Sequence, residues 1–134
     1  MEISQAVLSR IAQAQETLKE AEALWDHDLW RGVINRSYYA MFYAILALAA
    51  SRDVAISKHS HAISFFDKEF VRTGIFPKEL SRSVHYGFDQ RQTSDYGEIW
   101  EIEAGEAEKA LLEAKVFVEK VAFHLKGKKR FPEK

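Results

Sequence analysis

Apolar residues recur every three or four positions along much of the chain, the spacing that places them on one face of an α-helix. Between residues 3 and 25 such a stripe is formed by Ile3, Val7, Ile11, Ala14, Leu18, Ala21 and Trp25. A second stripe lies between residues 102 and 126, formed by Ala107, Leu111, Ala114, Val118, Val121 and Leu125. We therefore expect a long amphipathic helix near each end of the chain.

A third long helix is predicted over residues 29–52, with Asp28 as its N-cap. Its second half, from residue 38 to residue 50, is apolar on every side, so it should be buried among the other helices. This apolar run is shorter than the roughly 20 residues that a membrane-spanning helix needs. We therefore interpret it as the central core helix of a globular protein.

Two shorter helices are predicted between these long ones. One begins after Ser57, its expected N-cap, and the other covers residues 77–95. Five antiparallel helices joined by short connections give an all-α, up-down helical bundle. The length of 134 residues fits one domain, so we expect a single domain over residues 1–134 with a basic C-terminal tail at about 127–134.

Composition and charge narrow the classes of function. The chain has no cysteine, which excludes disulfides and cysteine-ligated zinc. The five histidines form no His-Glu-x-x-His pattern, so we expect neither a metal nor a cofactor. With a net charge of −1, the protein as a whole does not attract nucleic acid, so contact with nucleic acid would need a local basic patch. The N-terminus does not have the pattern of a signal peptide, which predicts a cytoplasmic protein.

The chemistry of the inward stripe changes along the helix predicted at 77–95. Leu80, Val84 and Phe88 are apolar, but Arg91 and Asp95 continue the same spacing. An exposed ion pair would contribute only about 0.3–0.5 kcal/mol, and burial brings no advantage because desolvation offsets the attraction. A functional site and a structural ion pair are therefore about equally good explanations for the charge at this position.

A polar and aromatic strip follows the first half of the 29–52 helix, where Asn35, Tyr39 and Tyr43 are spaced by four and Arg36 precedes Tyr39 by three. The guanidinium fork of arginine suits phosphate, and tyrosines beside it suit stacking on a base. The alternative is that the tyrosines are half-buried core residues whose hydroxyls reach the surface. We expect this second role for Tyr38 and the first for Arg36 and Tyr39.

Three segments together resemble small stand-alone HEPN proteins of bacteria and archaea. Residues 35–44 (NRSYYAMFYA) are similar to the second-helix signature of that group. His59 and residues 63–74 look like its third-helix region, and residues 91–97 (RQTSDYG) resemble its Arg-x-x-x-Asp-Tyr-Gly segment. The resemblance covers most of the chain and implies a helical bundle that forms a homodimer.

The resemblance also implies a class of function. Many HEPN domains are metal-independent ribonucleases in which an arginine and a histidine are separated by four to six residues. Arg91 matches that arginine, whereas Tyr96 stands where the histidine first fits. Related small proteins are often the toxin partner of a minimal nucleotidyltransferase. We therefore expect a homodimeric nucleotide- or RNA-binding module in a toxin–antitoxin-like pair, with these binding residues: Asn35, Arg36, Tyr39, Tyr43, His59 and Arg91.

Two alternatives remain open at this point. A ribonuclease would use Arg91, with Asp95 and Tyr96, to assist attack by the ribose 2′-hydroxyl; His59 is a further candidate for that assistance. A non-enzymatic interaction module would use the strip on the 29–52 helix as its dimer surface. Tyr96 is also a candidate acceptor for nucleotide transfer from a partner nucleotidyltransferase.

Overall fold

A computed structural model describes residues 3–96 and 102–127, except for the side chains of residues 95 and 96. In that part of the chain every regular element is helical, and the order is α1 (Gln5–Asp26), α2 (Trp30–Ser51), α3 (His59–Phe66), η1 (Asp67–Val71), α4 (Lys78–Tyr96) and α5 (Ala104–Lys126). The element η1 is a π-helical turn that continues α3 directly. The fold is therefore the all-α bundle that the sequence predicts.

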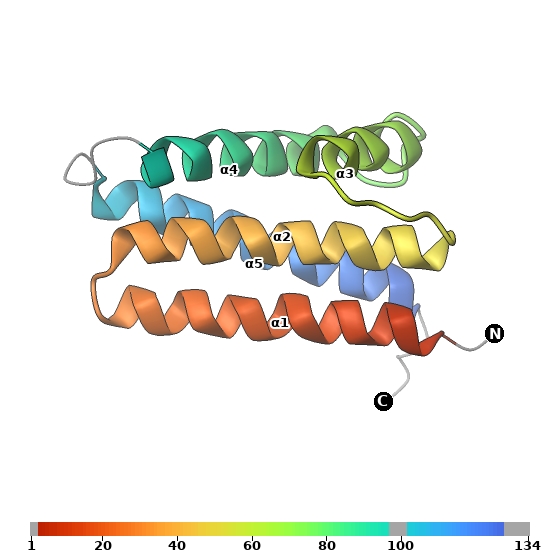
Figure 1. Ribbon diagram of the computed structural model, residues 1–134, viewed down its shortest axis with the longest axis horizontal. Helices are drawn as coiled ribbons and strands as arrows, with labels where there is room; N and C mark the ends of the chain where they lie inside the picture. Colours follow the sequence, from red (N-terminus) through yellow and green to blue (C-terminus); the bar gives the residue numbers. More distant parts are fainter. Residues whose placement is uncertain (1–2, 97–101, 128–134) are drawn as a thin grey trace.

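The four long helices pack in an up-down arrangement (Figure 1). Helix α2 lies between α1 and α4, and α5 packs against α2 from behind in this view. The short α3 with η1 lies beside α4, at the end of the bundle where α2 finishes. This order brings the first half of α2 next to the second half of α4, two regions that are far apart in the sequence.

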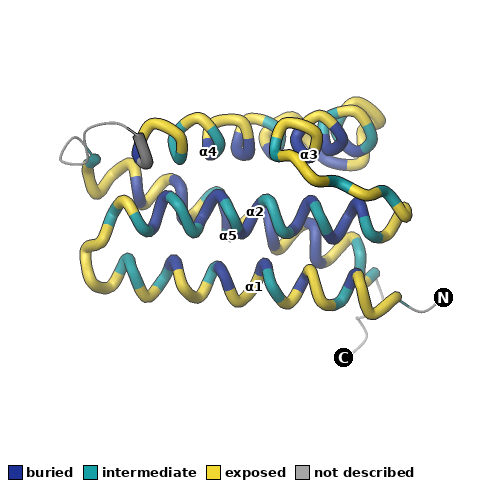
Figure 2. Tube along the Cα trace, in the orientation of Figure 1, coloured by how far each residue is buried: buried dark blue, intermediate teal, exposed yellow. Residues whose placement is uncertain are grey.

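Helix α2 is the core of the bundle, as its apolar run predicts. It carries eleven buried residues, and the buried positions of the other helices face it (Figure 2). By length and composition α2 alone among the described helices would be able to cross a membrane, but most of its surface is covered here by its neighbours. Its apolar character is explained by this central position.

Two predicted helix starts are wrong. Asp28 does not cap α2, because it adopts a left-handed backbone conformation with a φ of 59° and ends the α1–α2 turn. The N-cap is Leu29, whose side chain makes no capping hydrogen bond. Ser57 likewise does not cap α3, which begins after Lys58. In both cases the helix begins one residue later than the predicted N-cap indicates.

A glycine lets α4 approach α2 closely. A Cβ atom at Gly87 would lie 2.8 Å from the terminal methyl of Met41 and 3.6 Å from Cδ1 of Tyr38. A side chain at this position would therefore have to displace the methyl group of Met41. One turn later, α4 presents Arg91 to the aromatic residues of α2.

Candidate functional site

Arg91 lies on a surface of aromatic rings. Its guanidinium carbon is 5.4 Å from the ring centroid of Tyr38, 5.5 Å from that of Tyr39 and 5.8 Å from that of Phe88. Leu80 and Val84 are buried farther back on the same face of α4, while Arg91 is half-buried. The predicted change from an apolar to a charged stripe is thus present, and it meets the tyrosines of α2.

His59, the first residue of α3, is held against the same rings. Its Nδ1 is 2.7 Å from the hydroxyl oxygen of Tyr38. Its imidazole stacks on Phe42, with 4.2 Å between the ring centroids and 25° between the planes. We call Arg91, Tyr38, Tyr39 and His59 the Arg91 cluster.

Burial and charge keep His59 and Tyr38 neutral. The pKa of His59 is lowered from its usual value, first by burial and second by the positive charge of Arg91. The pKa of Tyr38 is raised, mainly because its hydroxyl is buried. Near pH 7 the cluster therefore holds a neutral imidazole, a protonated phenol and a guanidinium.

The hydrogen bond between them also favours one tautomer of His59. Within the described residues, the hydroxyl of Tyr38 hydrogen-bonds to His59 alone. A buried hydroxyl is costly when its proton has no acceptor, so Tyr38 should donate to Nδ1. The ring proton of His59 is then on Nε2, which is a hydrogen-bond donor.

A second arginine extends the site along α2. The guanidinium of Arg36 is 5.1 Å from the ring centroid of Tyr39, and its Nε donates to Oδ1 of Asn35 at 3.1 Å. Arg36 also forms an exposed ion pair with Glu20 of α1 at 3.3 Å. The ring of Tyr43 is 5.9 Å from that of Tyr39. Arg36 and Arg91 thus both contact one tyrosine ring.

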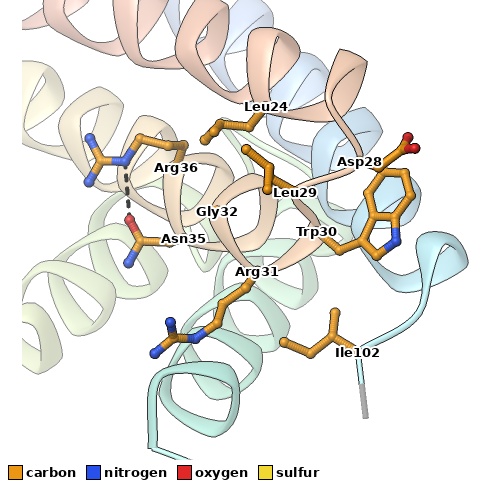
Figure 3. Close-up of a pocket in the computed structure, with 9 residues that line it drawn as sticks. All are labelled: Leu24, Asp28, Leu29, Trp30, Arg31, Gly32, Asn35, Arg36 and Ile102. Carbon is orange, nitrogen blue, oxygen red and sulfur yellow. Dashed lines mark hydrogen bonds between the residues drawn. The ribbon is translucent and has the colours of Figure 1, made fainter. Parts of the chain in front are cut away.

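A groove of about 710 Å³ opens beside Arg36, at the end of the bundle where α1 turns into α2. Figure 3 shows its lining residues: the guanidinium groups of Arg31 and Arg36 are on one side, and apolar side chains fill the other. Arg31 also donates from Nε to the backbone oxygen of Ser94 at 2.8 Å, which ties the start of α2 to the end of α4. The groove therefore adjoins the Arg91 cluster.

The structure brings together the residues that the sequence predicts as binding residues. Asn35, Arg36, Tyr39, Tyr43, His59 and Arg91 lie on connected parts of one surface. Tyr38 was expected to reach the surface with its hydroxyl; it is 1% exposed and hydrogen-bonds to His59 instead. The side chains of Asp95 and Tyr96, assigned to catalysis, lie outside the described residues.

The described residues contain no group of three or more histidine, aspartate or glutamate side chains that is placed to hold a metal ion. The surface itself is made of hydrogen-bond donors and aromatic rings. Two guanidinium groups and an imidazole N–H suit the oxygens of a phosphate. The rings next to them suit the faces of nucleobases.

Comparison with known proteins identifies the family. Residues 7–127 match the HEPN domain. A UPF0332 protein of Thermotoga maritima is 34% identical over 118 residues, covering 88% of this chain and 89% of that protein. Two proteins of Methanocaldococcus jannaschii, named "Putative toxin MJ0142" and "Putative toxin MJ0605", are 32% and 30% identical; the alignments cover 88% and 93% of this chain and 80% and 92% of those proteins. The chain belongs to the HEPN domain family.

Proposed function

We propose that this chain is a toxin-like HEPN module that binds a nucleotide or RNA, with a phosphate held at the Arg91 cluster. The observation that carries the proposal is the position of Arg91 over the rings of Tyr38, Tyr39 and Phe88, next to His59. Ring contacts orient a guanidinium without cancelling its charge. An arginine held in this way is suited to a phosphate anion.

The tautomer of His59 favours binding over base catalysis in the resting site. With Tyr38 donating to Nδ1, Nε2 of His59 is a donor and has no lone pair to accept a proton. A neutral donor close to Arg91 adds a second hydrogen bond to a phosphate oxygen. It also adds no second positive charge that would have to be desolvated.

The printed names of the two archaeal relatives, "Putative toxin MJ0142" and "Putative toxin MJ0605", support a toxin-like role. The proposal extends this to a homodimer paired with a minimal nucleotidyltransferase, as the family resemblance implies. In a homodimer, two copies of the Arg91 cluster would be available to one RNA.

The test is binding of a labelled single-stranded RNA at several salt concentrations by fluorescence anisotropy. Arg91→Ala should weaken binding about tenfold or more. It should also reduce the slope of log affinity against log salt by about one, because one phosphate contact is lost. The matched control is Arg82→Ala, which removes an arginine of the same helix that is 71% exposed and pairs only weakly with Glu79.

The proposal is wrong if both variants bind as the wild type does, or if both lose the same affinity and the same salt slope. The first result would exclude Arg91 from the binding surface. The second would mean that the RNA responds only to the total charge of the protein. Circular dichroism of each variant verifies that the helices are intact.

A metal-independent ribonuclease is the second candidate, favoured by one observation: a neutral imidazole lies next to an arginine. In that reaction Nε2 of His59 would accept the 2′-hydroxyl proton, which requires the other tautomer and rotation of the Tyr38 hydroxyl. Cleavage of RNA in EDTA by the wild type but not by His59→Ala would establish this activity. If the folded protein binds RNA but does not cleave it, the ribonuclease candidate is wrong and RNA binding is the remaining function.

The third candidate, a non-enzymatic interaction module, differs in its response to changes on α2. It predicts that Arg36→Ala or Tyr39→Ala abolishes the homodimer in gel filtration, while RNA does not bind to the wild type at all.

A further inference from the structure

The groove at the α1–α2 turn has no role in the proposed phosphate site, although it opens directly beside it. We infer that this groove is a nucleobase subsite, which holds the base of a nucleotide whose phosphate is bound by Arg36 and Arg31. The inference rests on the proposed function and makes it more specific. It names the substrate class as a single-stranded stretch of RNA rather than a duplex.

The walls of the groove suit a flat, apolar ligand. They are formed by four apolar side chains, Leu24, Leu29, Trp30 and Ile102, and by the backbone at Gly32. A volume of about 710 Å³ lies in the range of small-molecule sites. The indole of Trp30 packs against that of Trp25, with 4.9 Å between the ring centroids, and this contact holds the wall in place. Burying a base against such walls removes its apolar faces from water.

Gly32 leaves room in the groove because it has no side chain. A Cβ atom at this position would lie 2.9 Å from Cδ1 of Leu24. A side chain here would therefore displace Leu24 and narrow the groove. The helical backbone at Gly32 does not need glycine for its conformation, because its φ is not positive. Close approach of Leu24 is the reason for glycine that the structure provides.

Charge around the groove fixes the direction of the ligand. Arg31, Arg36 and the amide of Asn35 are on one side, and the carboxylate of Asp28 is on the other, beyond Trp30 (Figure 3). A phosphate is attracted to the arginines and repelled by Asp28, so the base points toward Trp30. Glu20 pairs with Arg36, but the pair is exposed and therefore weak enough for a phosphate to compete.

The groove and the Arg91 cluster are connected through Tyr39, whose ring is contacted by both Arg36 and Arg91. Two phosphates of one strand would then lie on the two arginines, with the intervening surface formed by Tyr39. A base enters the groove only when it is free of its partner strand, because the faces and edges of paired bases are covered in a duplex. This is why the site should select single strands.

The experiment uses a fluorescein-labelled hexa-adenylate with 2′-fluoro sugars, which lacks the nucleophile needed for cleavage. Adenosine 5′-monophosphate and ribose 5-phosphate compete for the protein, and they differ only in the base. For the wild type the nucleotide should compete about tenfold better, the order expected from base stacking. A longer, stably paired RNA duplex should compete more weakly than an unpaired strand of the same length.

Leu29→Ala removes one wall of the groove and should reduce the advantage of the nucleotide over ribose 5-phosphate about fivefold. Leu112→Ala is the matched control, because Leu29 and Leu112 are both 53% exposed and Leu112 is on α5, away from the groove. The control should keep the full advantage. Both variants should fold, since neither side chain belongs to the core.

The outcomes separate this inference from the proposed function. If the hexa-adenylate binds and responds to Arg91→Ala, but both competitors are equal and Leu29→Ala has no effect, the base subsite is wrong and the phosphate site stands. An apolar side chain of a partner protein would then be the better occupant. If the wild type binds neither the hexa-adenylate nor the nucleotide, both proposals are wrong.

Discussion

Replacing Tyr38 by phenylalanine removes one oxygen atom from the centre of the candidate site. The ring of Tyr38 is 1% exposed and packs between α2, α3 and α4, so the phenylalanine ring has space in the same position. The hydrogen bond to Nδ1 of His59 is the interaction that disappears. The variant therefore tests whether this bond holds α3 and its histidine in place.

The expected loss follows from the two partners that the bond joins. A typical hydrogen bond inside a protein contributes about 1 kcal/mol to the free energy of unfolding. The Nδ1 of His59 is left without its donor, but the half-exposed imidazole has access to water, so the larger penalty for a buried unpaired group does not apply. A loss of about 1 kcal/mol corresponds to a decrease of about 4 °C in Tm for a chain of this size.

Urea unfolding followed by circular dichroism measures this difference, with Tyr39→Phe as the control. Within the described residues the hydroxyl of Tyr39 makes no hydrogen bond, so its loss should cost less than about 0.5 kcal/mol. Nitrogen-15 NMR of the imidazole gives a second readout. The wild type should carry the proton of His59 on Nε2, and Tyr38→Phe should populate both tautomers.

Equal stability of Tyr38→Phe and the wild type, with an unchanged tautomer, would refute the reasoning. It would mean that stacking on Phe42 alone positions His59. A loss several times larger than expected would also contradict it, because it would imply that the phenol oxygen supports more of the core than this one contact.

Two further predictions concern the same part of the molecule. Ser37 is fully buried on α2, and among the residues that the structure describes its hydroxyl has no hydrogen-bond partner. Ser37→Ala should therefore raise the free energy of unfolding by about 1 kcal/mol in a urea titration; a loss of stability would show that the hydroxyl is satisfied in solution. The pKa of His59 is lowered in the folded protein, so below pH 6.5 the unfolded chain binds a proton that the folded chain resists. The free energy of unfolding is therefore unaffected by His59 above this pH, and it decreases as the pH falls from 6.5 toward the lowered pKa of the folded protein. Between pH 7.5 and 5.0 the wild type should therefore lose more stability than His59→Asn, and equal losses would contradict this.

The helices were predictable because their signals are local. The stripes of α1 and α5 repeat along the sequence itself, and the apolar run in α2 is long enough to require a central position. The charged end of the α4 stripe also predicts that Arg91 faces inward, and in the structure its guanidinium lies against the rings of Tyr38 and Tyr39.

What the sequence does not encode locally is which side chains meet. The hydrogen bond between Tyr38 and His59 joins α2 to α3. The segment between these helices has no periodic pattern, so the sequence does not show that His59 lies over Tyr38, and it predicts the hydroxyl at the surface. The groove joins Leu24, Trp30 and Ile102 from three separate segments, and no spacing in the sequence brings them together. The capping preference of Asp28 predicts the start of α2 one residue too early, because the positive φ of Asp28 completes the α1–α2 turn instead.

The short length of α3 has a consequence for how the site opens. Even with the π-helical turn η1 that continues it, α3 is too short to persist alone in water, so it depends on its contacts with the bundle. Arg91 and Tyr39 lie on long helices, whose opening would disturb the core. His59 lies at the first residue of α3, next to the irregular connection from α2. Amide hydrogen exchange should therefore be faster in α3 than in the middle of α2, because a local opening there would withdraw the imidazole while the arginine and its rings stay assembled.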